Sequence, residues 1–247
     1  MYRNLSAHKI HQTTFQLHAR IQERFPDSSL RGVAEEICEV TKEALNRIQF
    51  LRRPIWTLRI LNGALLTSVV LLIGYMIHAL GIELSGEFKD VGEFIQILEP
   101  ALGSIVFIGA FILLVWSTEI RVKRKRAFAA LHELRSLAHI IDMHQLTKDP
   151  GRLIFHAMDT SSSPQLQMTP FELTRYFDYC SELLSMISKI SALYAQNFDD
   201  PEALQSVDQL EILTNGLSRK IWQKMSILEP HLLQNPPTEK TEAPSKA

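Results

Sequence analysis

The sequence has few of the residues that mark a disulfide-bonded, metal-stapled or loop-rich protein. Its 247 residues include 2 cysteines, Cys38 and Cys180, which lie far apart without a C-x-x-C pattern. Neither a disulfide framework nor a structural zinc site is therefore expected. Glycine and proline number only 10 and 11, and the chain is rich in Leu, Ala, Glu, Lys, Gln and Arg. That composition favours an all-α fold.

Sequence patterns of catalysis and of nucleic-acid binding are missing too. There is no Gly-rich phosphate loop, nucleophile elbow or paired-carboxylate pattern. The net charge of −1 does not favour nucleic acid or an acidic partner. The first 25 residues are polar and His-rich and contain no apolar core of signal-peptide type. We expect no enzymatic activity, no cofactor and no nucleic-acid partner.

Two long uncharged stretches dominate the middle of the chain. Residues 60–82 and residues 100–118 contain no Asp, Glu, Lys or Arg. A helix needs about 20 apolar residues to cross the hydrocarbon core of a bilayer, so both stretches qualify as membrane spans. Two buried core helices of a soluble protein are the alternative, but such helices are usually shorter and interrupted by polar residues. The sequence predicts a two-span transmembrane helical hairpin.

Basic residues beside the two spans predict the orientation of the hairpin. Lys and Arg are frequent before the first span and after the second, whereas residues 83–99 between them hold only Lys89. Cationic flanks stay on the cytoplasmic side, so both termini should be cytoplasmic. Trp56 and Trp116 would lie at the inner interface, which indoles prefer. We predict a multi-pass plasma-membrane protein and, because no organelle-targeting segment is visible, the bacterial inner membrane.

The densest basic run, RVKRKRAF at residues 121–128, directly follows the second span. We interpret it as a topology anchor that also contacts anionic lipid headgroups, worth about 1 kcal/mol per basic residue near the surface. It lacks the interleaved aromatic residues of a nucleic-acid platform. The residues assigned this role are Arg121, Lys123, Arg124, Lys125 and Arg126.

Apolar residues outside the spans recur at helical spacing and predict a cytoplasmic helical bundle. A stripe of Ile10, Thr14, Leu17 and Ile21 indicates a helix over 4–24, and FPDSS at 25–29 should end it. Further stripes are expected on three other helices: Leu30, Val33, Ile37, Val40, Ala44 and Leu51, interrupted by Arg47; Leu173, Phe177, Cys180, Leu184, Ile187 and Tyr194; and Leu204, Val207, Leu210, Leu213, Leu217, Ile221, Met225 and Leu228. The first of these stripes resembles a coiled coil, although packing within the chain explains it equally well.

Helix-start signals divide the C-terminal part. TPFE at 169–172 has the pattern of a capping box with Pro170 at the first helical position, and DDPE at 199–202 begins a second helix of an antiparallel hairpin. The predicted segments are N-terminal helices 1–55, span 56–82, outer loop 83–99, span 100–119, extension helix 120–147, loop 148–168, hairpin 169–235 and disordered tail 236–247.

The extension helix carries the densest polar cluster of the chain. At helical spacing His132, Arg135, His139 and Asp142 share one face. His139 and Asp142 are close enough to form a hydrogen-bonded pair or to ligate a metal together, but a third ligand would have to come from elsewhere in the fold. Spaced His and Asp residues are weaker evidence than a metal motif, so a helix-surface polar network is the preferred interpretation.

Glu99 lies at the outer mouth of the second span, in QILEPALG at residues 96–103. In an oligomer whose second span lines an axis, Glu99 would form an acidic ring that attracts cations. The ILEP motif and the two-span topology resemble the mitochondrial calcium uniporter family, and the resemblance implies a cation pore at Glu99. That family carries an acidic residue three positions earlier, where this chain has Gln96. A Glu-Pro pair is also a common helix start.

Three functions follow, of different classes. The first is a membrane scaffold, sensor or assembly component whose cytoplasmic helices hold a protein partner or a second copy of the chain, with anionic lipids as further partners. The second is a homo-oligomeric cation channel with Glu99 and Gln96 at its mouth. The third is a membrane-anchored metal-dependent enzyme that uses His139 and Asp142.

Overall fold

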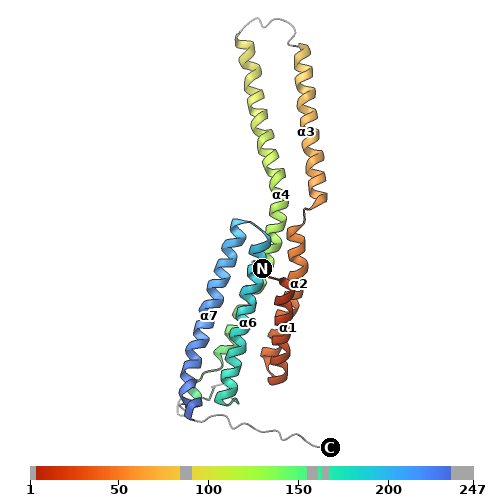
Figure 1. Ribbon diagram of the computed structural model, residues 1–247. Coiled ribbons are helices and arrows are strands. Elements are labelled where there is room, and N and C mark those ends of the chain that lie inside the picture. The colour runs from red at the N-terminus through yellow and green to blue at the C-terminus, as the bar shows by residue number, and fades with distance from the viewer. Residues whose placement is uncertain (1–3, 84–90, 155–160, 163–166, 235–247) are drawn as a thin grey trace, which may run out of the picture. The chain divides into compact units, whose positions relative to one another are not determined.

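The computed structural model describes residues 4–83, 91–154, 161–162 and 167–234, and within them the fold is all-helical with no strand. Figure 1 shows the order of the helices along the chain. Their bounds are α1 Ala7–Arg24, α2 Ser29–Arg52, α3 Trp56–Glu83, α4 Val91–Leu146, the short α5 Gly151–Ile154, α6 Pro170–Asn197 and α7 Pro201–Gln234.

The chain forms two compact units. The first, which we call the bundle, comprises Met1–Arg52 and Ala127–Ala247. The second, which we call the hairpin, comprises Arg53–Arg126. The α4 helix contributes its first part to the hairpin and its last part to the bundle.

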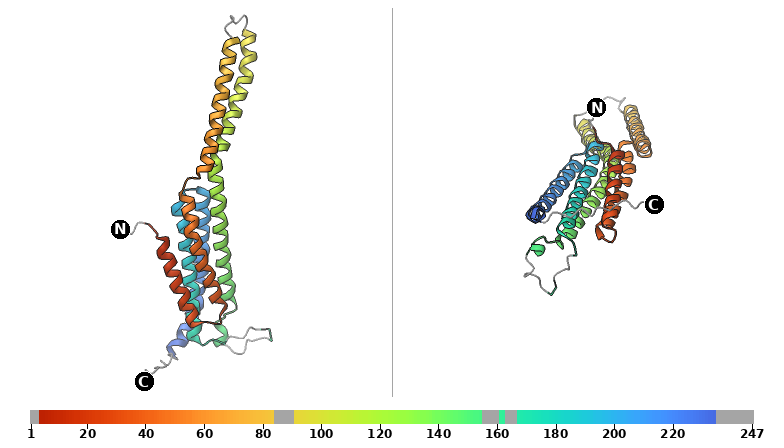
Figure 2. Two further views of the ribbon diagram at one scale, coloured as in Figure 1. Left: turned by 90° about the vertical axis from the view of Figure 1, so that its right-hand side faces the viewer. Right: turned by 60° about the horizontal axis from the view of Figure 1, so that its bottom comes forward.

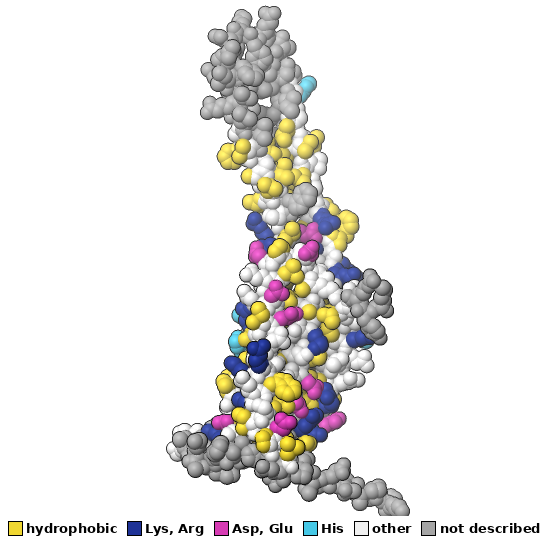
Figure 3. All heavy atoms as spheres, turned by 60° about the vertical axis from the view of Figure 1, so that its left-hand side comes forward, with side chains coloured by type: hydrophobic (Ala, Val, Ile, Leu, Met, Phe, Trp, Pro, Cys, Tyr) yellow, Lys and Arg dark blue, Asp and Glu magenta, His cyan; other side chains and the backbone are white. Residues whose placement is uncertain are grey.

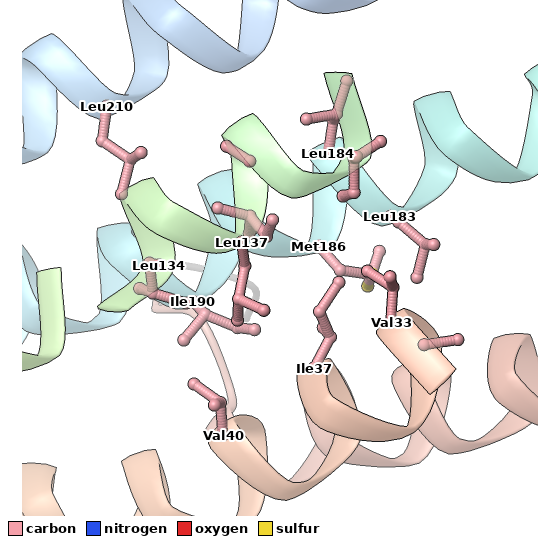
Figure 4. Close-up of a cluster of buried hydrophobic side chains, with 14 of the residues drawn as sticks. Val33, Ile37, Val40, Leu134, Leu137, Leu183, Leu184, Met186, Ile190 and Leu210 are labelled. Carbon is pink, nitrogen blue, oxygen red and sulfur yellow. The ribbon is translucent and has the colours of Figure 1, made fainter. Parts of the chain in front are cut away.

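The bundle is built around α6, which contacts α1, α2 and α7. Its core gathers buried aliphatic side chains from α2, α4, α6 and α7, and Figure 4 shows ten of them by name (Val33, Ile37, Val40, Leu134, Leu137, Leu183, Leu184, Met186, Ile190 and Leu210). Burial of such side chains contributes roughly 1.5–3 kcal/mol each. The hydrophobic effect therefore holds the five long helical segments of the bundle together.

Most of the expected stripe residues are buried. All the named stripe residues of α1, α2 and α6 are in the core, including Cys180, which is 0% exposed. Leu204 was expected to point inward and does not, because it is 36% exposed. Its neighbour Ala203 is buried instead, and one residue along a helix turns the side chain by about 100°.

Side-chain caps begin α1 and α6. The Ser6 side chain accepts a hydrogen bond from the Lys9 amide at 3.4 Å. At α6 the full capping box forms: Thr169 Oγ1 accepts from the Glu172 amide at 3.2 Å, and the Glu172 carboxylate accepts from the Thr169 amide at 2.8 Å. Pro170 occupies the first turn, where its missing N–H is not needed.

Two expected loop boundaries differ from the structure. The α4 helix begins at Val91, inside the expected outer loop, and continues through Pro100. The α5 turn lies inside the expected loop 148–168. The α7 helix continues through Pro230 to Gln234, within the expected hairpin 169–235. A proline removes one backbone donor from a helix but does not stop the residues on either side from being helical. The expected tail 236–247 lies outside the described residues.

Polar contacts between helices also fix the bundle. Arg47, the interruption in the α2 stripe, donates to the carboxylate of Glu133 on α4 at 2.5 Å and also pairs with Glu43. Arg20 of α1 pairs with Glu182 of α6 at 2.6 Å. Arg47 is therefore one side of an ion pair that joins α2 to α4, which explains a charged residue within an apolar pattern.

Candidate functional site

The hairpin exposes an unusual amount of apolar surface. The range Ser29–Tyr75, which comprises α2 and most of α3, holds an 18-residue window of mean hydropathy 1.7, and none of this window is buried in the protein. Among the described residues this is the one stretch long and apolar enough to cross a membrane. Large exposed side chains on α3 and the first part of α4 include Ile60, Leu61, Val70, Leu71, Tyr75, Val106, Phe107, Leu113 and Leu114.

The second expected span, residues 100–118, is described only in part. Several of its residues, among them Trp116, have side chains outside the described set. Figures 1 and 2 show that α3 and the first part of α4 run antiparallel to each other. Figure 3 shows one face of this helix pair. Beyond the end of the pair that is next to the bundle along the chain, the described side chains on that face are hydrophobic, with no Lys, Arg, Asp or Glu.

One end of the hairpin is polar. Glu119 of α4 accepts hydrogen bonds from Arg59 Nε of α3 at 2.9 Å and from the Ile55 amide at 3.3 Å. Lys123 Nζ lies 2.9 Å from the same carboxylate, and its side chain is only 12% exposed. Glu119 therefore joins the start of α3 to α4 and balances two of the nearby cations.

Asn62 extends these contacts one turn into the apolar stretch. Its side-chain amide donates to the Val115 carbonyl at 3.0 Å and to Thr118 Oγ1 at 3.2 Å. In an apolar environment such a bond keeps two helices in register, because the amide has no water to bind instead. We call Arg59, Asn62, Thr118, Glu119 and Lys123 the polar base of the hairpin.

The basic run after the second expected span divides by exposure. The side chains of Arg121, Lys125 and Arg126 are exposed, whereas Lys123 and Arg124 are partly buried. Because Lys123 is paired with Glu119, its charge is partly neutralised. Contact of this run with anionic headgroups remains a prediction, and the exposed side chains are the ones positioned to make it.

The four residues of the polar face predicted on the extension helix have separate partners or surroundings. Arg135 donates to Gln209 Oε1 of α7 at 3.1 Å, and Asp142 accepts from Gln145 Nε2 at 2.5 Å. His132 and His139 are exposed. The described contacts of Arg135 and Asp142 are thus with glutamines rather than with the two histidines.

Metal and pore chemistry find no geometric support in the described part of the chain. No group of three or more His, Cys, Asp or Glu residues comes together there in an arrangement that could hold a metal ion. Glu99 and Gln96 lie in α4, but their side chains are outside the described set. The acidic ring at Glu99 therefore stays a prediction.

Two open hollows mark the surface of the bundle. One, of about 480 Å³, is lined by Asn4, Leu51, Arg52, Gln196, Asn197, Phe198 and Asp199. The other, of about 450 Å³, lies between the α1–α2 connection and residues 148, 167 and 168. The hydroxyl of Ser29, which lines the second hollow, lies 3.1 Å from Nδ1 of His144 on α4.

Sequence reasoning missed Glu119 and Asn62. Asn62 is the one side-chain amide within the uncharged residues 60–82, and Glu119 is the first charged residue after residues 100–118. Both signals were visible, but their pairing depends on the alignment of two helices separated by many residues.

Comparison with known proteins adds no relative. No protein family matches the chain, and neither the curated proteins nor the solved structures include one with significant similarity to it. The local resemblance of the Glu99 segment to the calcium uniporter family thus has no counterpart at the level of the whole chain.

Proposed function

We propose that the protein is an integral membrane protein that crosses the bilayer twice, through α3 and the first part of α4. Its bundle then lies in the cytoplasm and presents a helical interaction surface, so that the protein acts as a scaffold, sensor or assembly component. The bacterial inner membrane is the proposed location. Anionic lipids at the basic run and a protein partner on the bundle are the proposed ligands.

The unburied apolar window on α3 carries this proposal. Burial of a large apolar surface is the main favourable term in folding, and monomeric soluble proteins rarely leave a contiguous apolar patch above a few hundred Å² exposed. A bilayer provides the apolar surroundings that the hairpin does not find within the chain. The polar base supports the proposal, because its charged groups lie at one end of the apolar stretch, where headgroups and water would meet them.

The charges beside the hairpin support the proposed orientation. Arg53, Arg121 and Lys125 are exposed within a few residues of the polar base along the chain, and such residues remain on the cytoplasmic side during insertion. With two spans, both termini lie on that same side. The cation-channel and metal-enzyme hypotheses gain no observation from the described residues.

Thiol labelling in intact cells tests the topology. Cys38 and Cys180 are buried and should react slowly with a membrane-impermeant maleimide. Ser85→Cys, between the expected spans, should be labelled from outside. Gln205→Cys, exposed on α7, should be labelled only after permeabilisation.

Extraction completes the test. Alkaline carbonate should leave the full chain in the membrane fraction, and detergent should release it. Release of the chain by carbonate would overturn the membrane proposal. Labelling of both cysteines from the same side would instead overturn the two-span topology.

A further inference from the structure

The last part of α4 exposes a narrow stripe. From Ala127 to Leu146, the exposed residues all lie on one face of the helix, alternately three and four residues apart. The other residues of this segment are buried or partly buried in the bundle. We call these exposed residues the α4 stripe: Ala129, His132, Ser136, His139, Met143 and Leu146. In Figure 2 this part of α4 runs along one edge of the bundle.

The composition of the α4 stripe is unusual for a helix face in water. It contains no Asp, Glu, Lys or Arg over more than four turns, whereas a solvated face is normally rich in them. Met143 and Leu146 are 58% and 64% exposed. The next position toward the hairpin at the same spacing is Lys125, which limits the stripe on that side.

The charged residues beside the stripe are engaged within their own chain. Glu133 pairs with Arg47 of α2, and Arg135 donates to Gln209 of α7. Asp142 accepts from Gln145. These contacts draw the flanking charges toward the bundle and leave an uncharged strip between them.

We infer that the α4 stripe is the contact surface for a second copy of this chain, arranged as a parallel helix pair about a two-fold axis. Spacings of three and four are the pattern by which one helix packs along another. At a two-fold axis each residue of the seam meets its own copy, so a charged residue would face a like charge. The α4 stripe satisfies this requirement at all six positions.

The kinds of side chain suit such a pairing. Ala129 and Ser136 are small and allow close approach of the two helices, while Met143 and Leu146 supply apolar contact. His132 and His139 can hydrogen-bond across the axis, since a neutral imidazole carries one donor and one acceptor. The parallel direction rests on the proposed function, because two chains inserted with the same topology present α4 in the same direction.

Disulfide trapping of the full chain in native membranes tests the pairing. Ser136→Cys and Ala129→Cys should each give a covalent dimer on mild oxidation, because each position meets itself in a parallel pair. Among the described residues, Ser136 Oγ bonds to the His132 carbonyl of its own helix, and the side chain is exposed, so the substitution leaves the bundle core untouched. Asn215→Cys, exposed on α7, is the matched control and should stay monomeric.

The pattern of trapping separates the possible results. Absence of a dimer at Ser136, or equal trapping at Asn215, would overturn the pairing. A dimer at Ser136 without one at Ala129 would overturn the parallel arrangement. Carbonate extraction and maleimide labelling test the membrane proposal separately. Their outcome does not by itself change whether Ser136→Cys forms a disulfide-linked dimer.

A charge placed on the stripe provides an independent measurement. His132→Glu and His139→Glu put like charges at the axis and should raise the dimer dissociation constant at least about tenfold, measured by native mass spectrometry in detergent. Gln205→Glu adds the same charge on α7 and should leave the dimer dissociation constant unchanged. Equal dissociation constants for all three variants, or a wild-type chain that is monomeric throughout, would overturn the inference.

Discussion

Lys224 of α7 donates a hydrogen bond to the backbone carbonyl of Gln145 on α4 at 2.7 Å, and a longer one, at 3.3 Å, to the carbonyl of Lys148. The final carbonyls of a helix have no partner within it and carry partial negative charge. The ammonium group adds a charged donor to the Gln145 carbonyl near the end of α4, which also accepts from the Lys148 amide at 3.2 Å. The same group lies 5.6 Å from the centroid of the Phe177 ring. Burial lowers the pKa of Lys224, while Asp149 and Asp142 oppose that effect. One side chain thus joins α7 to the end of α4.

Replacing Lys224 by methionine should destabilise the bundle. Lys224→Met keeps an apolar stem but removes the charged donor of the Gln145 carbonyl, which retains the Lys148 amide at 3.2 Å, and should cost about 1 kcal/mol. Thermal unfolding of the purified chain in detergent, followed by circular dichroism, measures the change. Lys220→Met, at an exposed position of the same helix, should change stability by less than about 0.5 kcal/mol. Equal effects of the two variants would contradict this role.

Loss of the Thr169 cap should weaken the start of α6. Thr169→Ala removes both side-chain bonds of Oγ1, to the Glu172 amide and the Glu172 carboxylate, and should cost about 1 kcal/mol. Thr13→Ala is the control, since Thr13 is exposed and its described hydrogen bond goes to the Lys9 carbonyl of its own helix. Alanine has the higher helix propensity, so this control should be neutral or slightly stabilising in the same unfolding measurement.

Asn62→Leu should loosen the hairpin without preventing insertion. Leucine makes α3 more apolar but cannot donate to the Val115 carbonyl or to Thr118. Hydrogen bonds between membrane helices are worth roughly 0.6–2 kcal/mol, so the unfolding midpoint in detergent should fall while carbonate extraction stays unchanged. Thr67→Val, which removes a bond within α3 only, should have the smaller effect. A hairpin unaffected by Asn62→Leu would show that these bonds do not contribute to its stability.

Alkaline pH should destabilise the bundle in part through Tyr194. Burial raises the pKa of Tyr194 from 10.0 to about 12, although the neighbouring Arg47 opposes the shift. Between these two values the unfolded chain has lost the phenolic proton and the folded chain has kept it. Stability therefore falls as pH rises from about 10 to about 12. Tyr194→Phe should reduce the slope of unfolding free energy against pH in that window. Identical slopes would exclude Tyr194 as a contributor.

Helices were predictable where one apolar face meets a core. Ile10, Leu17 and Ile21 on α1 lie at regular helical spacing because the bundle covers only one side of each helix. The Thr169 cap was predictable because both of its partners lie within four residues. Sequence spacing carries enough information for contacts of this local kind.

Contacts between helices were not predictable in the same way. Arg47 appeared only as an interruption of an apolar stripe, and its partner Glu133 lies on α4. The same holds for Lys224 with Gln145 and for Asn62 with Val115. Each pairing depends on how helices are aligned and rotated, which a single helix's pattern does not encode. The continuation of α4 through Pro100 shows that a proline is a weaker boundary signal than a capping side chain.

The placement of the tryptophans has a spectroscopic consequence. The chain has 3, and the two whose side chains are described, Trp56 and Trp222, are 68% and 64% exposed. The described aromatic residues of the bundle core are instead Phe25, Tyr176, Phe177, Tyr179, Tyr194 and Phe198. Emission from Trp56 and Trp222 therefore reports on surfaces rather than on core packing. If the hairpin lies in a bilayer, brominated lipids should quench Trp56 and spare Trp222, so each unit carries its own fluorescent reporter.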